Sequence, residues 1–498
     1  MQKATYESYK NTLQKIADIK YASAVLQWDQ ETYLPSKGND ARGRQIATLN
    51  EMAHIQFTDE KLGIILNELV NDDTLSATEK RNVQLSLQDY NKNKKLPSAF
   101  VRQMSEAVNK SFHTWIQARK ENNFAVFEKP LQAIIDLKKQ EAKYIGYEHH
   151  PYDALMNDYD NGLTTTIVDK IFADLRPQLK TLLDKIATKP KVDTSFLHQH
   201  FDKNTQWELG LEILKGMHFD FDAGRQDISE HPFTTNFCSQ DVRVTTRIDE
   251  NDLSNMLWSC IHEGGHALYE QGLPAEQYGL PLGEYCSLSI HESQSRLWEN
   301  CIGRSEAYWQ KNYHLLKGKF GIQLKNVTLN SFYKGINSVQ PSLIRTEADE
   351  LTYHFHIMIR YEIEKLLIEG SITAKDIPTY WNEKYLQYLG IQVPDDINGC
   401  LQDVHWSHGS FGYFATYSLG SLYAAQFNTT LYNQNSSLVG KEDIVDFEYV
   451  WHWLQKNIYA FGRQYNSEDL CKKATGSNLD ASFFIQYATE KYGAIYGF

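Results

Sequence analysis

Apolar residues recur at the spacing of an α-helix through most of the first 146 residues. Side chains three and four positions apart share one face of a helix, so this spacing predicts amphipathic helices with one buried side. Prolines and glycines are few in this stretch, which favours long helices. The predicted helices include a first one from about Tyr6 and others at 41–55, 61–70, 77–91, 98–122 and 127–144.

The pattern changes in the middle of the chain. A turn-rich joint at 147–162 is followed by helical spacing at 165–187 and 204–217. β-Branched and aromatic residues are then frequent at 231–237, and apolar and polar residues alternate at 241–248. That alternation predicts short, half-buried strands. An exposed strand edge of this kind can bind an extended peptide backbone.

Helical spacing returns after the predicted strands and continues to the end of the chain. An apolar stripe begins at Leu253, a second amphipathic helix is predicted at 284–302, and a long one at 350–368. We therefore expect a mainly α-helical protein with a small sheet. We interpret 1–498 as one domain with two lobes, the first mainly helical (1–160) and the second (161–498) carrying the sheet and the motifs described below.

Composition excludes several classes of partner. The net charge of −13 is spread over 498 residues without a long run of one sign, which argues against nucleic acid or an anionic membrane as partner. No run of about 18 apolar residues occurs, so no membrane-spanning helix is expected. The N-terminus is polar and does not resemble a signal peptide. The six cysteines are scattered without a C-x-x-C pair, which predicts reduced thiols in a cytoplasmic protein.

The helix predicted after the strands carries His262-Glu263-Gly264-Gly265-His266, a His-Glu-x-x-His motif. Histidines four residues apart lie one turn apart on one face and can reach a single metal ion. Neutral imidazole suits Zn²⁺, and a neighbouring carboxylate can take a proton from water at an open coordination position. Such a motif also occurs by chance, but these groups are costly to bury in an apolar stripe without partners.

The paired glycines and the third metal ligand require separate explanations. Glycine weakens a helix by about 1 kcal/mol per residue, so another helix or a substrate backbone is expected to approach this turn closely. A catalytic zinc usually has three protein ligands. Glu292, 26 residues beyond His266, can return beside it on the next helix. Its rivals as third ligand are Glu284, Glu270 and His291.

Six motifs in this order resemble the carboxypeptidase Taq family, the thermostable-carboxypeptidase-1-like metallopeptidases. They are HPF at 231–233, D-x-R-x-T at 241–245, H-E-x-x-H at 262–266, H-E-S-Q at 291–294, I-R-x-x-A-D at 344–349 and G-x-x-Q-D-x-H-W at 399–406. One departure is Ala415, where the family commonly has proline; it removes no functional group.

The resemblance implies a metal site and an activity. The implied metal ligands are His262, His266 and Glu292, with Glu263 as the catalytic carboxylate. The implied cofactor is one divalent ion per subunit, usually Zn²⁺, with Co²⁺ able to substitute. The implied protein is a homodimer that releases single residues from peptides with a free C-terminus, with broad specificity. The implied fold is a zincin-like helical one with a deep substrate groove, similar to neurolysin-like and angiotensin-converting-enzyme-like peptidases.

A carboxypeptidase further needs a cation for the terminal carboxylate, and the guanidinium fork of arginine suits a bidentate contact. Arg345 is the first candidate and Arg243 the second. The alternative for each is a structural ion pair, Arg345 with Asp349 and Arg243 with Asp241.

The developing oxyanion needs hydrogen-bond donors beyond the metal. His405 and Tyr413 are the candidates. Gln402 is a candidate for binding substrate backbone, and Asp403 for orienting a histidine.

Two other functions remain open at this point. The first is an oligopeptidase or dipeptidyl carboxypeptidase on the same scaffold, which would share the metal chemistry and differ in how it holds the substrate carboxylate. The second is a non-catalytic binding protein that keeps the fold; the intact Glu263 and ligand set argue against it.

Overall fold

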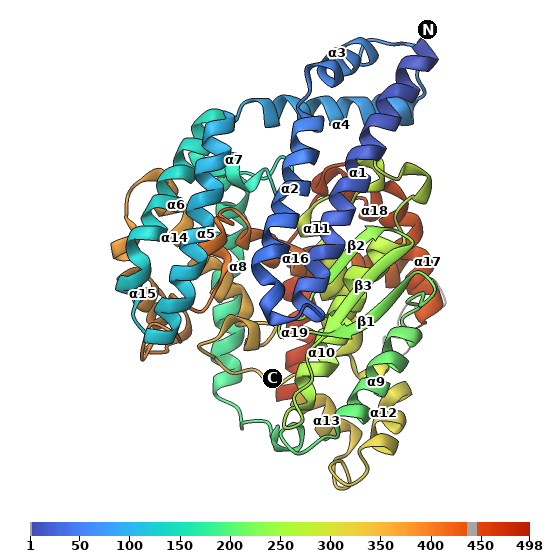
Figure 1. Cartoon of the computed structure of the whole chain (residues 1–498). Coiled ribbons are helices and arrows are strands. Elements are labelled where there is room, and N and C mark those ends of the chain that lie inside the picture. The colour runs from blue at the N-terminus through green and yellow to red at the C-terminus, as the bar shows by residue number, and fades with distance from the viewer. Residues whose placement is uncertain (1, 436–445) are drawn as a thin grey trace. The chain divides into compact units, whose positions relative to one another are not determined.

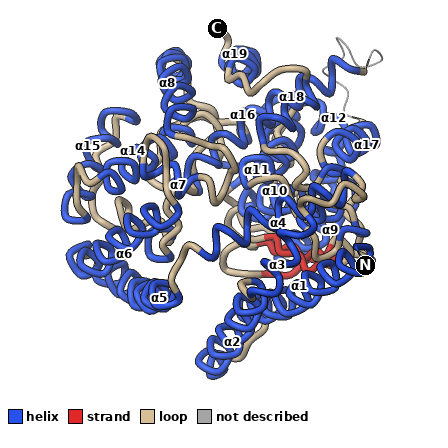
Figure 2. The backbone as a smooth tube through the Cα atoms, turned by 90° about the horizontal axis from the view of Figure 1, so that it is seen from above, coloured by secondary structure: helices blue, strands red, loops and turns tan. Residues whose placement is uncertain are grey.

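A computed structural model describes residues 2–435 and 446–498, and most of them lie in helices (Figure 2). The chain divides into two compact units that interleave along the sequence. Unit 1 comprises 1–94, 193–336 and 424–479, and unit 2 comprises 95–192, 337–423 and 480–498. The boundary predicted at 160 therefore falls inside a continuous segment of unit 2.

Unit 1 contains the sheet and the following helices: α1 (Gln2–Thr32), α2 (Asn39–Phe57), α3 (Glu60–Leu69), α4 (Ala77–Lys94), α9 (Lys203–Gly216), α10 (Leu253–Gln271), α11 (Leu288–Arg296), α12 (Glu306–Lys319), α13 (Leu329–Ile336), α17 (Phe447–Asn457) and α18 (Ser467–Thr475). Helix α16 (Phe414–Gln434) belongs to unit 2 up to Tyr423 and to unit 1 beyond it. Helices α1 and α2 form an antiparallel hairpin (Figure 1).

The regular secondary structure in the described residues of unit 2 is all helical. Its helices are α5 (Ser98–Glu121), α6 (Phe124–Ile145), α7 (Pro151–Met156), α8 (Thr165–Ala187), α14 (Tyr353–Glu369), α15 (Ile377–Leu389) and α19 (Ser482–Tyr496). Local chemistry explains several of these boundaries. Thr164, for example, accepts the backbone N–H of Ile167 and so caps α8 where the sequence predicts a helix start.

The prediction of a mainly helical protein with a small sheet is confirmed. The strands are β1 (Gly224–Ile228), β2 (Thr234–Cys238) and β3 (Asp241–Thr246), in the order β1-β3-β2. Strand β3 is parallel to β1 and antiparallel to β2. Val242, Val244 and Thr246 are buried, as the alternation predicts, but Thr245 on the opposite face is buried as well, and the strand ends before Ile248. Strand β1 was not predicted because its buried residues, Gln226 and Asp227, are polar and give no apolar alternation.

Helix α10 lies against β2 and β3 and is also packed closely between two other helices (Figure 1). A Cβ at Gly265 would lie 2.7 Å from the carbonyl oxygen of Gln294 on α11. A Cβ at Gly264 would lie 2.8 Å from a methyl group of Leu214 on α9. The two glycines therefore allow close helix packing on two sides of the same turn, one of the two explanations that the sequence left open.

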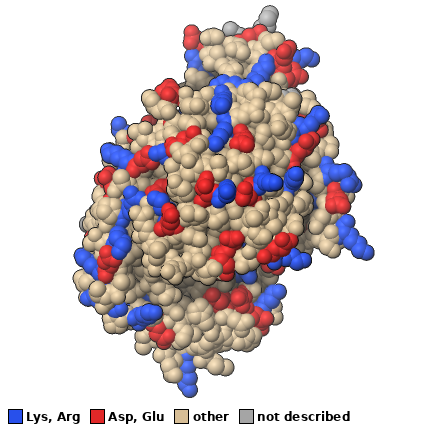
Figure 3. Space-filling view, turned by 90° about the vertical axis from the view of Figure 1, so that its left-hand side faces the viewer, with Lys and Arg blue, Asp and Glu red and all other residues tan. Residues whose placement is uncertain are grey.

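Surface and cysteine features agree with the composition. None of the described helices is long and apolar enough to span a lipid bilayer. Acidic and basic side chains are interspersed on the face shown in Figure 3. All six cysteines are free thiols, and all but Cys238 are buried.

Candidate metal centre

Three side chains of unit 1 converge on one point: His262 and His266 of α10 and Glu292 of α11. One potential ligand atom from each lies within 4.8 Å of the others, and no other trio of His, Cys, Asp or Glu side chains comes as close in the described parts of the chain. Glu292 Oε2 lies 3.9 Å from His262 Nε2 and 3.5 Å from His266 Nε2. The carboxylate therefore faces the outer nitrogens of both rings.

The local sequence explains why these groups meet. Asp252 accepts the N–H of Ser254 and starts α10, which places the two histidines one turn apart. Ser287 caps α11 by accepting the N–H of Ile290, so that Glu292 follows in the second turn. The close approach of α11 at Gly265 then places Glu292 beside His266.

A second carboxylate orients His262. Its Nδ1 lies 2.9 Å from Glu299 Oε2, so an Nδ1–H can donate to Glu299 while Nε2 faces Glu292. Glu299 lies in a π-helical turn, Leu297–Gly303, that directly continues α11. Arg296 and Arg304 also contact Glu299, at 3.4 and 3.0 Å. Carboxylates commonly hold metal-binding histidines in this way.

The rivals of Glu292 have other contacts. Glu270 accepts a hydrogen bond from His291, whose other ring nitrogen lies 2.6 Å from His266 Nδ1. Glu284 faces Arg463 at 3.4 Å. His291 therefore meets His266 at Nδ1, and Glu270 lies beyond His291, whereas Glu292 faces Nε2 of the same ring.

Glu292 and His266 are in the protonation states that a cation needs, whereas His262 must lose a proton that its raised pKa favours. Burial alone raises the pKa of Glu292, but the charges of Arg296 and His262 outweigh burial and lower it below its usual range. Burial lowers the pKa of His266 to about 3, which keeps that ring neutral. Burial also lowers the pKa of His262, but Glu292 and Glu299 outweigh it and the net pKa is raised.

The fit to a divalent ion rests on this donor set. Two imidazole nitrogens and one carboxylate are a usual set for a catalytic zinc, and they leave a position for water. Both rings have their inner nitrogens hydrogen-bonded, so their outer nitrogens are directed at Glu292. The residues therefore fit a divalent metal.

Glu263 lies between the two histidines in sequence and is buried. The Thr234 hydroxyl donates to Glu263 Oε2 at 2.7 Å and so ties the carboxylate to β2. Burial raises the pKa of Glu263. A buried carboxylate with a raised pKa can accept a proton and hold it, which is what a general base that later acts as an acid requires.

Unit 2 contains a separate buried cluster of charged groups around Asp403. Arg345 Nε and Arg360 Nε donate to its two oxygens at 2.9 and 2.5 Å. Gln402 Oε1 accepts from the backbone N–H of Arg345 and from Arg360. The alternative pairing of Arg345 with Asp349 does not form; Asp349 instead accepts N–H groups at the start of α14.

His405 and Tyr413 also lie together in unit 2. Their rings are 5.4 Å apart, and His405 Nε2 lies 3.3 Å from the Tyr417 hydroxyl. Burial and the positive charge of Arg345 lower the pKa of His405 to about 3. The ring is therefore neutral at neutral pH. Its buried Nδ1 lies 3.9 Å from Asp403 Oδ1 and has no hydrogen-bond partner among the described residues.

Arg243 is found in the ion pair that the sequence allowed as its alternative. It donates to both oxygens of Asp241, each at 2.9 Å. Its guanidinium also lies over the Trp28 and Phe237 rings, 4.3 and 4.9 Å from their centres. One carboxylate thus balances its charge.

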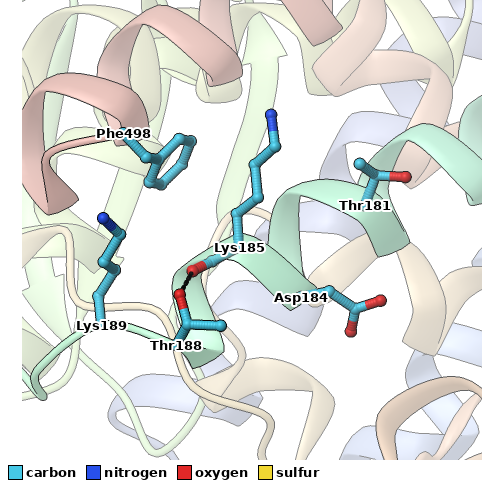
Figure 4. Close-up of a pocket in the computed structure, with 6 residues that line it drawn as sticks. All are labelled: Thr181, Asp184, Lys185, Thr188, Lys189 and Phe498. Atoms are coloured by element: carbon cyan, nitrogen blue, oxygen red, sulfur yellow. Dashed lines mark hydrogen bonds between the residues drawn. The ribbon is translucent and has the colours of Figure 1, made fainter.

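One open pocket of unit 2 contains none of these groups. Figure 4 shows it between α8 and the chain's last residue, with Lys185 and Lys189 on either side of Phe498. Both ammonium groups lie within 6 Å of the ring centre, at 5.6 and 5.8 Å. This pocket assembles no catalytic set.

Comparison with known proteins identifies the family. The sequence model of the carboxypeptidase Taq (M32) metallopeptidase family matches residues 8–492 of this chain. The chain belongs to this family. Carboxypeptidase 1 of Bacillus subtilis is 37% identical to it over 99% of both chains, and thermostable carboxypeptidase 1 of Thermus thermophilus is 36% identical, also over 99% of both. The crystal structure of an M32 carboxypeptidase from Deinococcus radiodurans superposes with a TM-score of 0.97 at 38% identity, covering 99% of this chain and 100% of the other.

Membership of the carboxypeptidase Taq family makes the protein a metallocarboxypeptidase that acts on peptides and depends on a divalent metal. Three residues of its two buried clusters were not predicted. Glu299 lies seven residues after Glu292, in the π-helical turn that continues α11, which the sequence did not predict. Arg360 is a charge within the otherwise apolar α14. Nothing in the sequence marks Thr234 as the partner of Glu263.

Proposed function

We propose that the protein releases single C-terminal amino acids from peptides, with broad specificity, by Glu263-assisted attack of water on the last peptide bond. The observation that carries this proposal is the convergence of His262, His266 and Glu292 with Glu263 on the same helical turn. When bound, the metal polarises the scissile carbonyl and makes water more acidic. We propose Zn²⁺, which Co²⁺ can replace, because two imidazoles and a carboxylate suit both ions.

Glu263 moves the proton in this scheme. As the water oxygen forms a bond to the carbonyl carbon, its proton passes to Glu263. Glu263 then gives that proton to the nitrogen of the last residue as the C–N bond breaks. The products are a shortened peptide with a new carboxylate and one free amino acid. The Thr234 hydroxyl holds the Glu263 carboxylate in a fixed orientation for both transfers.

Arg345 is our candidate for binding the terminal carboxylate. Asp403 is shared by Arg345 and Arg360, so two guanidinium groups face one carboxylate and one positive charge is left in excess. Arg243 is balanced one to one by Asp241, which supports it less as the binding cation. The side-chain carbonyl oxygen of Gln402 accepts hydrogen bonds from Arg345 and Arg360. We propose that Gln402 contributes to substrate binding by positioning these two residues.

His405 and Tyr413 are proposed as donors to the oxyanion. A neutral His405 carries one N–H, and its Nδ1 makes no hydrogen bond within the described parts of the chain. The family resemblance further supports a zincin-like fold with a deep groove and a homodimer, and the six free cysteines support a cytoplasmic location; we propose these for this protein as well.

A single peptide digestion tests the proposed activity. One unblocked peptide and its C-terminally amidated copy are incubated with Zn²⁺-loaded enzyme, and the products are followed by mass. We expect stepwise loss of single residues from the free peptide and little cleavage of the amide. Release of dipeptides, or equal rates on both peptides, would overturn the proposal in favour of a dipeptidyl carboxypeptidase or an oligopeptidase.

A further inference from the structure

A chain of hydrogen bonds runs from His266 through His291 and Glu270 to Asn236 of β2. His266 Nδ1 lies 2.6 Å from His291 Nδ1, and His291 Nε2 lies 2.7 Å from Glu270 Oε1. Asn236 of β2 donates to the other oxygen, Glu270 Oε2, at 2.5 Å. We call His266, His291, Glu270 and Asn236 the histidine relay. Glu270 is buried, and His291 is largely shielded.

The positions of the protons follow from the chemistry of imidazole. A neutral ring carries one N–H, and its other nitrogen is an acceptor. His266 must present a bare Nε2 to a metal, so its proton is on Nδ1 and is donated to His291 Nδ1. His291 then carries its own proton on Nε2 and donates it to Glu270. Metal binding at His266 thereby fixes the tautomer of both rings.

The relay is held in place from several sides. The Tyr285 ring meets His291 edge-on, 4.9 Å between centres, and the Tyr269 ring lies 5.4 Å away. Asn236 fixes the Glu270 carboxylate from the strand. His291 therefore has little freedom to rotate away from His266.

Glu270 and Glu299, the partner of His262, differ in the positively charged side chains that lie beside them. Arg296 and Arg304 both contact Glu299 and offset its charge. In the described parts of the chain, no Lys or Arg side chain forms an ion pair with Glu270; its contacts are His291 and Asn236. A carboxylate at this place can act on His266 through His291 and make His266 a stronger donor to a cation.

We propose that His291 and Glu270 are positioning residues that fix the tautomer of His266 and strengthen its bond to the metal. This inference rests on the proposed metal site. Loss of such outer partners typically weakens metal binding by roughly 10- to 100-fold. The two histidine ligands would then be tuned separately, His262 by an arginine-balanced carboxylate and His266 by an unbalanced one acting through a second ring.

Metal affinity tests the proposal without relying on activity. The dissociation constant for Zn²⁺ is measured by competition with a chelator in wild type and in three variants. Glu270→Gln keeps an acceptor for His291 but removes the charge. His291→Asn keeps an acceptor near the Nδ1 position but breaks the link to Glu270. His291→Leu removes both links. We expect affinity to fall in every variant, most in His291→Leu, by about 10- to 100-fold.

A matched control excludes general damage to α11. Ser289 is buried on the same helix, and its hydroxyl has no hydrogen-bond partner among the residues that the structure describes, so Ser289→Ala should keep the wild-type affinity. The melting temperature of each metal-free variant checks that it folds. Wild-type affinity in Glu270→Gln and His291→Leu, with both folded, would overturn the proposal. If wild type and His266→Ala bind Zn²⁺ equally, the metal site itself is misassigned and the proposed function fails with it.

A spectroscopic measurement examines the tautomer directly. In Co²⁺-loaded protein, the Nδ1 protons of both histidine ligands should give paramagnetically shifted, exchangeable proton NMR signals. In His291→Leu, the His266 signal should exchange faster with solvent while the His262 signal, protected by Glu299, persists. Glu299→Gln should alter the His262 signal instead. Unchanged exchange of both signals in His291→Leu would contradict the relay.

Discussion

Gly265 of α10 and Gln294 of α11 approach so closely that a Cβ on the glycine would lie 2.7 Å from the glutamine carbonyl oxygen. This contact sets the separation of the two helices that carry His266 and Glu292. A methyl group there cannot be accommodated without moving backbone, because the obstacle is a main-chain atom. The spacing of the candidate metal ligands therefore depends on a residue that is not one of them.

Gly265→Ala is expected to separate α10 from α11. Inserting a methyl group into a packed contact typically costs about 1–3 kcal/mol of folding free energy. We expect a lower melting temperature and weaker Zn²⁺ binding, measured by calorimetry and chelator competition. Gly43→Ala is the matched control, because Gly43 lies in α2 with open space around it; that change should stabilise the protein. Unchanged metal affinity in Gly265→Ala would contradict the role given to the contact.

Glu263→Gln should leave the metal bound and remove the proton carrier. We expect kcat/KM to fall by at least about 10²-fold, the lower end of the usual contribution of general acid–base catalysis. Metal content is measured by atomic absorption alongside the rate. A variant with bound metal and wild-type activity would refute the proposed proton transfer.

Arg345→Lys should weaken recognition of a free C-terminus, because lysine cannot make a bidentate contact. We expect kcat/KM on an unblocked peptide to fall by about 10-fold or more, with a smaller change on the amidated peptide. Arg243→Lys, in which the ion pair with Asp241 can persist, is the comparison. A larger loss in the Arg243 variant would reverse the order of our two candidates.

Removal of the metal should abolish peptide cleavage and lower the melting temperature, since an ion that binds only the folded protein stabilises it. Dialysis against a chelator, followed by return of Zn²⁺ or Co²⁺, tests this by rate and calorimetry. Full activity in metal-free protein would contradict the dependence on metal.

Glu364 in unit 2 should make stability depend on pH. Its carboxylate accepts hydrogen bonds from Tyr152, Trp406 and the N–H of Gly412, and burial raises its pKa to about 7. The folded protein thus keeps a proton that the unfolded chain releases near pH 4.5, so stability falls as pH rises from about 4.5 through 7.

Glu364→Gln isolates this effect, because glutamine does not titrate. Melting temperatures of the chelated wild type and variant are compared at pH 5.5 and 8.5. We expect the melting temperature of the wild type, relative to that of Glu364→Gln, to be lower at pH 8.5 than at pH 5.5. A difference that does not change with pH would contradict the raised pKa.

The sequence predicted the candidate metal site because the signals of its two histidines are local. A motif one helical turn long put His262 and His266 on one face, and the next predicted helix contained Glu292. The strand alternation in β3 was equally local. The order of motifs along the chain added the family, which no single motif could have identified.

The missing parts depend on tertiary contacts. Asp403 pairs with Arg345 and with Arg360, 58 and 43 residues away, and no spacing rule links them. Glu299 reaches His262 through a π-helical turn, which has no signature in residue type. The position of His291 beside α10 depends on how α11 packs at Gly265, which the sequence does not show.

The interleaving of the two units also has a consequence for how the chain folds during synthesis. Unit 1 needs residues 424–479 to be complete, although its first residues are made at the start. At about 5–20 residues per second, the ribosome takes roughly 20–85 s to reach position 424. Tyr269 packs against Tyr459, and Trp298 and Tyr308 pack against Phe447. These buried side chains therefore lack their partners until that part of the chain has been made, and we expect chaperones to bind the nascent chain in that interval.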